Sequence, residues 1–265
     1  MHARFHAWTG ALARALSLAF ALALLATPAL AQGTGGPPGI DHYKVYRVLP
    51  PPTGVFPVIL RDQFGIGNDL TREFAYFATP VAKDGIPMFD PVTHYDWWTI
   101  EPRPIAGIVF ATNQFGPDQQ LKLEEARFLF APSLKFPQPG QVIPPRNHYK
   151  CYAVTGPSPG RVVTLEDQFG FNQAFVDSAR FFCNPVEKRL PDGHLFPVED
   201  PEAHLVCYDI TKTPPSQIRT IIAQDQFGFW NAVLVADAYL CVPSFKTGVV
   251  PVLSRSWGAV KATYR

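Results

Sequence analysis

The stretch Asp167-Gln168-Phe169-Gly170 decides the fold, because versions of it recur four times with a period of about 53 residues. The other three copies are Asp62-Gln63-Phe64-Gly65, Asn113-Gln114-Phe115-Gly116 and Asp225-Gln226-Phe227-Gly228. Each copy lies between a segment that begins with histidine and an aromatic segment that ends in Pro-x-x-Lys. Residues that recur in every copy are expected to hold the fold or to bind something repetitively. We refer to the copies as units 1 to 4.

The units alternate in character. The leading histidines are His42, His94, His148 and His204. Units 1 and 3 begin His-Tyr-Lys-x-Tyr, whereas Asp-Pro-x-x-His leads into units 2 and 4. The repeating element is therefore a pair of units, 106 residues long from His42 to His148.

Apolar residues within a unit alternate with a period of two, as in Val163, Leu165 and then Asp167, which predicts β-strands. Asp or Asn at the start of a turn accepts hydrogen bonds from nearby backbone amides, and Gly at its end tolerates positive φ. We therefore predict an all-β fold of two homologous β-sandwich or small-barrel domains, each built from two ~53-residue units of three to four strands.

A Pro-rich segment between the two pairs is the expected domain boundary, since proline fixes φ and cannot donate to a sheet. The expected segments are a signal peptide (1–31), a flexible lead-in (32–40), a first domain (41–135), a linker (136–146), a second domain (147–246) and a C-terminal tail (247–265).

The N-terminus indicates export to a secreted or periplasmic location. Arg4 and Arg14 form a positively charged N-terminal region, which an apolar run follows. Ala29-Leu30-Ala31 has the small residues typical of a signal-peptide cleavage site. Removing residues 1–31, with two Arg and no acids, leaves 21 Lys and Arg against 22 Asp and Glu. This balance argues against nucleic acid as a partner. The apolar run is too short for a membrane span.

The cysteines occupy equivalent positions in units 3 and 4, at Cys151 and Cys183 and at Cys207 and Cys241. Near-equal separations and an even count in an exported chain favour one disulfide within each unit. The first pair of units holds Val45, Ala78, Trp97 and Phe130 at these positions. On sequence alone the other two pairings remain open.

Strand alternation places each histidine and the aromatic residue four positions later on one face, opposite the cysteine positions. One hypothesis is that these pairs line a repeated ligand surface for a glycan or a cell-envelope component. The alternative is that each histidine hydrogen-bonds a neighbouring loop within a two-sided core. Trp230, just beyond its turn, is a further candidate contact residue. The candidate binding residues are His42, Tyr46, His94, Trp98, His148, Tyr152, His204, Tyr208 and Trp230.

No motif indicates catalysis, a metal or a cofactor. The histidines lack the short spacing of metal sites. Asn113 replaces the turn Asp in unit 2, so a turn cap explains this position better than proton transfer. Gly156-Pro157-Ser158-Pro159-Gly160 matches a nucleophile elbow by letter, but Pro159 has no N–H to donate to an oxyanion.

The motifs of the second pair resemble a family of uncharacterised exported bacterial repeat proteins. The resemblance rests on His148-Tyr149-Lys150-Cys151-Tyr152, Asp167-Gln168-Phe169-Gly170, Ala203-His204-Leu205-Val206-Cys207-Tyr208 and Leu240-Cys241-Val242-Pro243-Ser244-Phe245-Lys246. It implies bacterial origin and export and supplies no activity. The family pattern carries cysteines in every unit, and units 1 and 2 depart from it.

We therefore expect a non-enzymatic binding or surface-interaction protein. The alternatives are a hydrolase with a site in a cleft between the domains and a purely structural envelope component. An enzyme requires unrepeated polar groups with shifted pKa values to converge in one pocket. Specific function is expected where the four units disagree.

Overall fold

The computed structural model describes residues 36–212 and 214–251, which form twelve strands and no helix, so the all-β prediction is confirmed. The strands are β1 (His42–Val48), β2 (Pro57–Asp62), β3 (Gly65–Lys83), β4 (His94–Asn113), β5 (Gly116–Lys135), β6 (His148–Thr155), β7 (Arg161–Asp167), β8 (Gly170–Arg189), β9 (Leu195–Phe196), β10 (His204–Thr211), β11 (Arg219–Asp225) and β12 (Gly228–Pro251).

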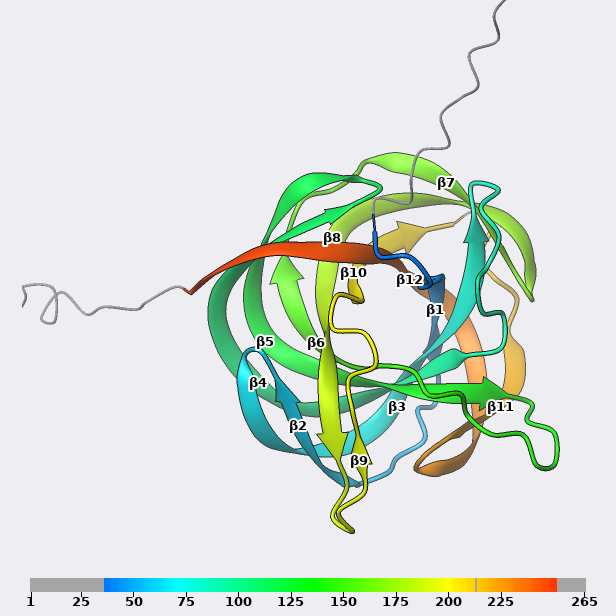
Figure 1. Cartoon of the computed structure of the whole chain (residues 1–265). Helices are drawn as coiled ribbons and strands as arrows, with labels where there is room; N and C mark the ends of the chain where they lie inside the picture. The colour runs from blue at the N-terminus through cyan, green and yellow to red at the C-terminus, as the bar shows by residue number, and fades with distance from the viewer. Residues whose placement is uncertain (1–35, 213, 252–265) are drawn as a thin grey trace, which may run out of the picture. The chain divides into compact units, whose positions relative to one another are not determined.

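Eight of these strands form a closed antiparallel ring (Figure 1). The strands pair in the order β1, β3, β4, β5, β6, β8, β10 and β12, and β12 returns to β1. Each unit contributes two ring strands: the strand that begins with histidine and the strand that follows the Gln-Phe-Gly turn. Closure leaves no unpaired edge in the ring.

The turns between strands have the predicted chemistry. The turn Asp or Asn accepts a hydrogen bond from the backbone N–H of the Phe two residues later, over 2.7–2.9 Å in all four units. The Gly that ends each turn has positive φ, which other residues rarely adopt. These glycines are Gly65, Gly116, Gly170 and Gly228.

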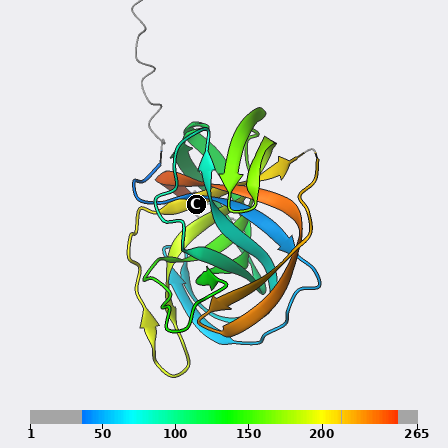
Figure 2. The same cartoon turned by 90° about the vertical axis from the view of Figure 1, so that its right-hand side faces the viewer.

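The parts of the long strands next to the turns leave the ring and form hairpins outside it; these are the first parts of β3, β5, β8 and β12 and the second half of β4. The β2–β3, β4–β5, β7–β8 and β11–β12 hairpins carry the four turns. The side view in Figure 2 shows these long strands curving around the ring. The ring strands are therefore buried on both faces, as the burial pattern of β1 and β6 shows.

The expected division into two domains differs from the structure. β5 pairs directly with β6 across the Pro-rich segment, and the described residues 36–212 and 214–251 belong to one compact unit. The physical reason is that a pair of units supplies four ring strands with two open edges, and each edge needs a hydrogen-bonding partner. The other pair supplies that partner, so the segment 136–146 connects neighbouring strands of one sheet.

The inside of the ring is a hydrophobic core to which all eight ring strands contribute. Trp97 lies at its centre, with its ring stacked on Tyr239 at 5.8 Å and on edge to Phe181 at 5.9 Å. The four positions that replace cysteine in units 1 and 2 are in this core, and they pair in register as Val45 with Ala78 and Trp97 with Phe130.

The predicted disulfides within units are confirmed. Cys151 bonds Cys183 and Cys207 bonds Cys241, and each bond joins register partners on adjacent ring strands. The Cα atoms of the two pairs lie 4.0 and 3.9 Å apart. Both bonds are buried in the ring interior, where cysteine alternates with the outward-facing residues as expected.

The described residues leave out part of the sequence at both ends of the chain. The expected C-terminal tail begins inside β12, which pairs with β4 up to Pro251. Residues 1–35, with the predicted signal peptide and the start of the lead-in, and residues 252–265 lie outside the described residues. Over the described ranges there is no helix of the length and apolarity needed to cross a membrane.

Candidate functional site

The aromatic residue four positions after each histidine is clamped by the turn of the unit two places along the chain. The Asp or Asn of that turn hydrogen-bonds the aromatic side chain, and the turn Phe contacts its ring within 5.0–5.5 Å. The bonded pairs are Tyr46 with Asp167, Trp98 with Asp225 (2.7 Å), Tyr152 with Asp62 (2.6 Å) and Tyr208 with Asn113 (2.9 Å).

Each of the first three histidines contacts the turn Gln of the next unit through its Nε2 atom. The distances are 2.7 Å for His42 and Gln114, 3.0 Å for His94 and Gln168, and 3.1 Å for His148 and Gln226. Burial lowers the pKa of His42 to about 3 and those of His94 and His204 to about 4. These rings are therefore neutral at physiological pH.

The lysine that ends a unit lies over the turn Phe of the next unit. The Lys Nζ atom lies 5.0–5.4 Å from the ring centroid in Lys83 with Phe115, Lys135 with Phe169 and Lys188 with Phe227. A cation over an aromatic face is attracted by the ring quadrupole. The repeated His, aromatic, Asp and Lys residues thus join each unit to its neighbours.

The eight candidate His and aromatic residues do not form an exposed face. Each is at most 5 % exposed, because the hairpins cover the outer side of the ring. The alternative interpretation, in which histidines bond a neighbouring loop within a two-sided core, describes His42, His94 and His148. Trp230 is half-buried, donates to Asp225 over 3.2 Å and packs on Trp98.

The units disagree at the residue before the Pro of Pro-x-x-Lys, and this difference leaves one polar group without a partner. Gln168 Nε2 donates to Thr79 Oγ1 over 2.9 Å, and Gln63 Nε2 donates to Asn184 Oδ1 over 2.8 Å. The equivalent partner position for Gln226 is Ala131, which has no polar side chain. Within the described residues Gln226 Nε2 is buried without a hydrogen bond.

His148 is also incompletely bonded. The Nδ1 atoms of His94 and His204 contact the carbonyl oxygens of Val92 and Glu202, at 2.7 and 3.0 Å. Unit 3 lacks the Asp-Pro-x-x-His lead-in that supplies this carbonyl, and His148 Nδ1 has no partner in the part of the chain described. Burial, and secondarily the charge of Lys188, hold the pKa of His148 well below its usual value.

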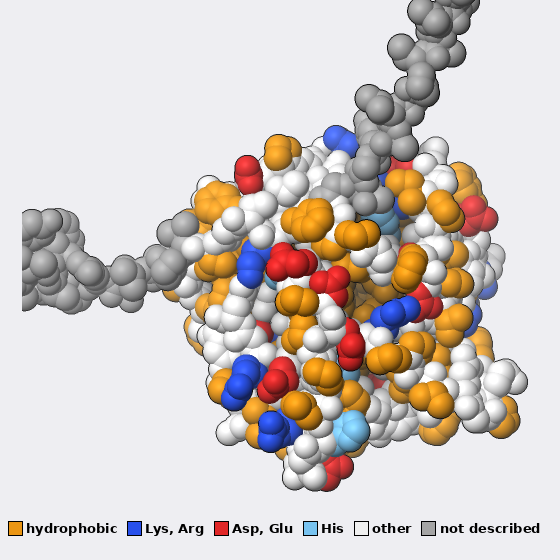
Figure 3. Space-filling model, viewed as in Figure 1, with side chains coloured by type: hydrophobic (Ala, Val, Ile, Leu, Met, Phe, Trp, Pro, Cys, Tyr) orange, Lys and Arg blue, Asp and Glu red, His pale blue; other side chains and the backbone are white. Residues whose placement is uncertain are grey.

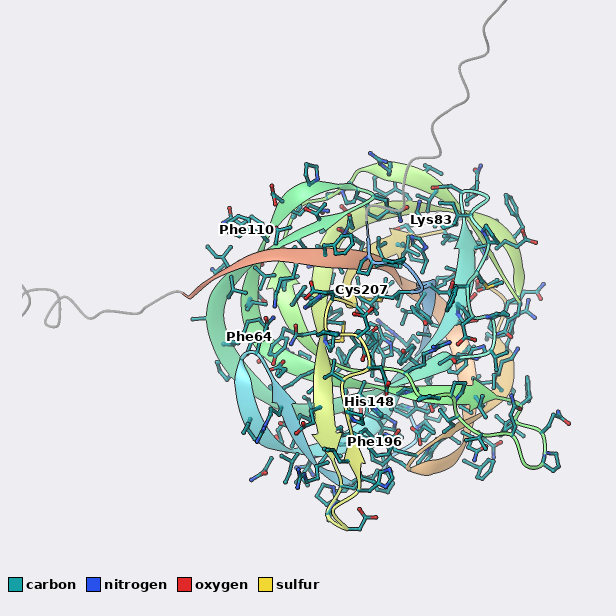
Figure 4. All side chains as sticks on the ribbon, viewed as in Figure 1. Phe64, Lys83, Phe110, His148, Phe196 and Cys207 are labelled. Atoms are coloured by element: carbon teal, nitrogen blue, oxygen red, sulfur yellow. A yellow bond between two sulfur atoms is a disulfide. The ribbon has the colours of Figure 1, made fainter. Side chains whose placement is uncertain are left out.

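His148 and Gln226 both line a cavity of about 310 Å³, which we call the β9 cavity. Its other walls come from the linker and from the loop that carries β9, an unrepeated extension paired with the end of β8. The Phe196 ring lies 4.9 Å from the His148 ring and 4.5 Å from the His194 ring. Figure 4 shows His148 and Phe196 next to each other beside β9.

A second cavity, of about 400 Å³, lies at the equivalent position beside Gln168. There the Gln side chain is bonded by both Thr79 and His94, and the His94 ring is bonded at both nitrogens. The two cavities therefore share a framework, but of these two the β9 cavity is the one whose lining residues include buried nitrogens without a partner among the described residues.

A group of buried ionisable residues lies behind the β9 cavity. Burial and the neighbouring Asp225 carboxyl raise the pKa of Asp96 well above its usual value. Asp225 accepts hydrogen bonds from both Trp98 and Trp230, and its pKa is also raised by burial. Burial lowers the pKa of Lys188 to about 7, and its Nζ atom lies 3.8 Å from the Phe196 ring centroid.

This ionisable group is enclosed by the protein. None of its three members lines the β9 cavity, and their exposed fractions are at most 4 %. No cluster of three His, Cys, Asp or Glu side chains suited to a metal occurs in residues 36–212 and 214–251. Charged and hydrophobic side chains are interspersed on the face shown in Figure 3, without a broad patch of one charge.

The sequence did not identify Gln226, His194 or Phe196 as site residues. A signal was present for Gln226, since Ala131 stands where units 1 and 3 have Thr79 and Asn184. The larger spacing between His148 and His204 indicates that unit 3 contains extra residues, which form the β9 extension. It does not indicate that these residues fold over a cavity.

Comparison with known proteins identifies the repeat and no activity. Neither the curated proteins nor the solved structures contain a match to the chain. The family model described as Repeat of unknown function (DUF7450) matches residues 94–243, which cover more than half of the chain. Four copies of the His, Gln-Phe-Gly and Pro-x-x-Lys elements built into one ring agree with a repeat family. The chain therefore belongs to the family Repeat of unknown function (DUF7450).

Proposed function

We propose that this protein is an exported, non-enzymatic binding protein that holds its ligand in the β9 cavity. The observation that carries the proposal is the β9 cavity itself, which the unrepeated β9 extension lines with Leu195 and Phe196. Concave, mostly apolar cavities with a few polar side chains in their walls are typical ligand sites.

Export is supported by the predicted signal peptide and by the two disulfides, which persist in oxidising compartments. Reducing compartments keep most thiols free. We therefore place the protein in the periplasm or outside the cell, where a glycan or a cell-envelope component would be its partner.

Hydrolysis is the second candidate, and the buried ionisable group is the observation that favours it. An acid or base must lie within hydrogen-bond reach of the reacting group. Asp225 is already bonded by two tryptophans and by the backbone N–H groups of Phe227 and Gly228, and Asp96 is fully buried. Binding therefore agrees better with the geometry than catalysis.

The test is a binding screen of the mature protein against glycans and isolated cell-envelope fractions, with Phe196→Ala as the variant. Alanine at position 196 removes the aromatic wall of the cavity and should reduce binding about tenfold. The matched control is Phe171→Ala, which removes an aromatic side chain that is 66 % exposed and does not line the cavity, and it should leave binding unchanged. Absence of binding by the wild type, or equal binding by Phe196→Ala, would contradict the proposal.

A further inference from the structure

One position of the repeat lies beside the clamping turns and changes in charge from unit to unit. It is the residue midway between the leading histidine and the clamped aromatic residue, and strand alternation places it on the same face as both. Each of these residues is at most 6 % exposed. They are Lys44 in unit 1, Asp96 in unit 2, Lys150 in unit 3 and Val206 in unit 4.

In units 1 and 3 this residue is a lysine that pairs with carboxylates of the other pair of units. Lys44 Nζ lies 2.9 Å from Asp237 Oδ1 and 3.8 Å from Asp167 Oδ2. Lys150 Nζ lies 3.1 Å from Asp69 Oδ2. Opposite charges therefore join these two units to the hairpins that cover them.

Unit 2 instead places a carboxyl against a carboxyl. The Asp96 side chain lies within hydrogen-bond reach of Asp225, the turn residue that bonds Trp98. Asp96 is fully buried and Asp225 is 4 % exposed. Among residues 36–212 and 214–251 no lysine, arginine or histidine forms an ion pair with either carboxyl. Two ionised carboxylates at this distance would repel each other strongly, because no water screens them.

The hydrogen bonds of Asp225 identify it as the ionised member of the pair. Its Oδ2 atom accepts from Trp98 Nε1 over 2.7 Å, and its Oδ1 atom accepts from Trp230 Nε1 over 3.2 Å. Oδ1 also accepts from the backbone N–H groups of Phe227 and Gly228, over 2.7 and 3.2 Å. Several N–H donors around one carboxyl favour its charged form.

Asp96 has the hydrogen bonds of a carboxylic acid. Its Oδ1 atom accepts from the Ser133 hydroxyl over 2.7 Å, whereas its Oδ2 atom has no donor in the part of the chain described. An unprotonated Oδ2 would be a buried acceptor without a partner, but a protonated Oδ2 can donate to Asp225. Burial, and secondarily the Asp225 charge, also hold the pKa of Asp96 well above its usual value.

We propose that Asp96 and Asp225 form a carboxylic acid–carboxylate pair that keeps one proton at neutral pH and is a proton-dependent joint between β4 and the unit 4 turn. Loss of that proton to the solvent breaks the hydrogen bond and leaves two like charges in a site that excludes water. The joint therefore weakens as pH rises. The lysine joints of units 1 and 3 need no shared proton, because their partners attract each other as ions.

Two further titratable side chains lie near the pair. Lys188 of β8 acts electrostatically on Asp225, and His148 of β6 lies close to Lys188. Because burial lowers the pKa of Lys188 to about 7, Lys188 makes the protein more stable with rising pH only above that value. The low pKa of the buried His148 acts in the same direction as that of Lys188, at lower pH. Comparing the wild type with a variant that retains both residues cancels these contributions.

The first test is urea unfolding of the mature protein and of Asp96→Asn between pH 5 and 6.5. Asparagine has the shape of aspartic acid, accepts from Ser133 and donates to Asp225, but it does not titrate in this range. The raised pKa means that folded wild type keeps a proton that the unfolded chain has already released, so its stability should fall with pH relative to the variant. The ratio of the two unfolding equilibrium constants should change about tenfold for each pH unit, or about 30-fold over the range.

The matched control is Asp177→Asn, which removes a solvent-exposed carboxyl from β8 and should keep the pH dependence of the wild type. Parallel pH dependences for the wild type and Asp96→Asn would overturn the proposal, because the folded protein would then hold no extra proton at Asp96.

The second test is infrared spectroscopy, which separates the C=O stretch of a carboxylic acid from the bands of carboxylates. At pH 7 the wild type should show one carboxylic acid band that Asp96→Asn lacks. In Asp225→Asn the same band should disappear at a lower pH, because the neighbouring negative charge is removed. Asparagine suits this turn position, since Asn113 occupies it in unit 2.

Circular dichroism identifies folded variants, and the comparison of the wild type with Asp225→Asn replaces the first test if Asp96→Asn does not fold. Absence of a carboxylic acid band from the wild type at pH 7, or its loss at the same pH in Asp225→Asn, would overturn the proposal.

Discussion

At the scale of single residues, recurrence separates the residues that hold the fold from those that differ. The repeated His, Gln and Lys side chains bond or stack on neighbouring units. The orphan nitrogen of Gln226 depends on Ala131, which lies in the opposite unit. Sequence could predict the face on which His148 lies, but not the hairpin that covers it, because that contact joins units far apart in the chain.

Lys188 should make the stability of the protein rise with pH. Burial holds its folded pKa at about 7, whereas the usual value is 10.5, so between these values the unfolded chain binds more protons than the folded one. The penalty for the buried charge is thus fully present below pH 7 and is relieved as pH rises toward 10.5, by up to about 1.4 kcal/mol for each pKa unit. Urea unfolding of Lys188→Met from pH 6 to 10 should show a smaller rise than the wild type.

The control for this measurement is Lys122→Met, which removes an exposed ammonium from β5 and should keep the slope of the wild type. Identical slopes for Lys188→Met and the wild type would show that the Lys188 ammonium is solvated in the folded protein.

At the scale of elements, strands, turns and cysteine pairs follow from local pattern. The Asp-Gln-Phe-Gly turns have the expected caps and positive φ at Gly, and each disulfide joins strands of one unit. These features depend on residues within one unit, where spacing and turn chemistry constrain the pairing. The sequence could not predict that the β9 extension closes a cavity, because the opposite wall of that cavity is formed by residues of the linker, which belongs to another part of the chain.

The first pair of units supplies a natural replacement for the disulfide of unit 3. Cys151→Val together with Cys183→Ala introduces the residues that Val45 and Ala78 provide at the same register positions. The protein should still fold, but the free energy of unfolding should fall by about 3–4 kcal/mol, because the unfolded chain is no longer cross-linked across 32 residues. Urea denaturation measures this loss. A loss below about 1 kcal/mol would show that packing, and not the cross-link, stabilises this unit.

At the scale of the whole molecule, closure of the ring was not predictable from the repeat. The Pro-rich segment and the 106-residue period favoured two domains, since both features are typical of a domain boundary. The sequence of an edge strand does not specify which strand it pairs with. The repeat pattern is therefore compatible with two small sheets or with one large ring. The aromatic clamps decide between these arrangements, because every one of them joins the first pair of units to the second.

This connectivity predicts that neither half of the protein folds alone. A fragment of residues 147–251 would expose the β6 and β12 edges that pair with β5 and β1, and it would leave Tyr152 without Asp62 and Asp167 without Tyr46. Its disulfides could form, but its turns would have no closed eight-stranded ring to pack against. NMR spectra of fragments 36–146 and 147–251 should show little dispersion separately, and mixing them should restore the dispersed spectrum of the intact protein. A dispersed spectrum and cooperative unfolding of the isolated 147–251 fragment would instead establish an independent second domain.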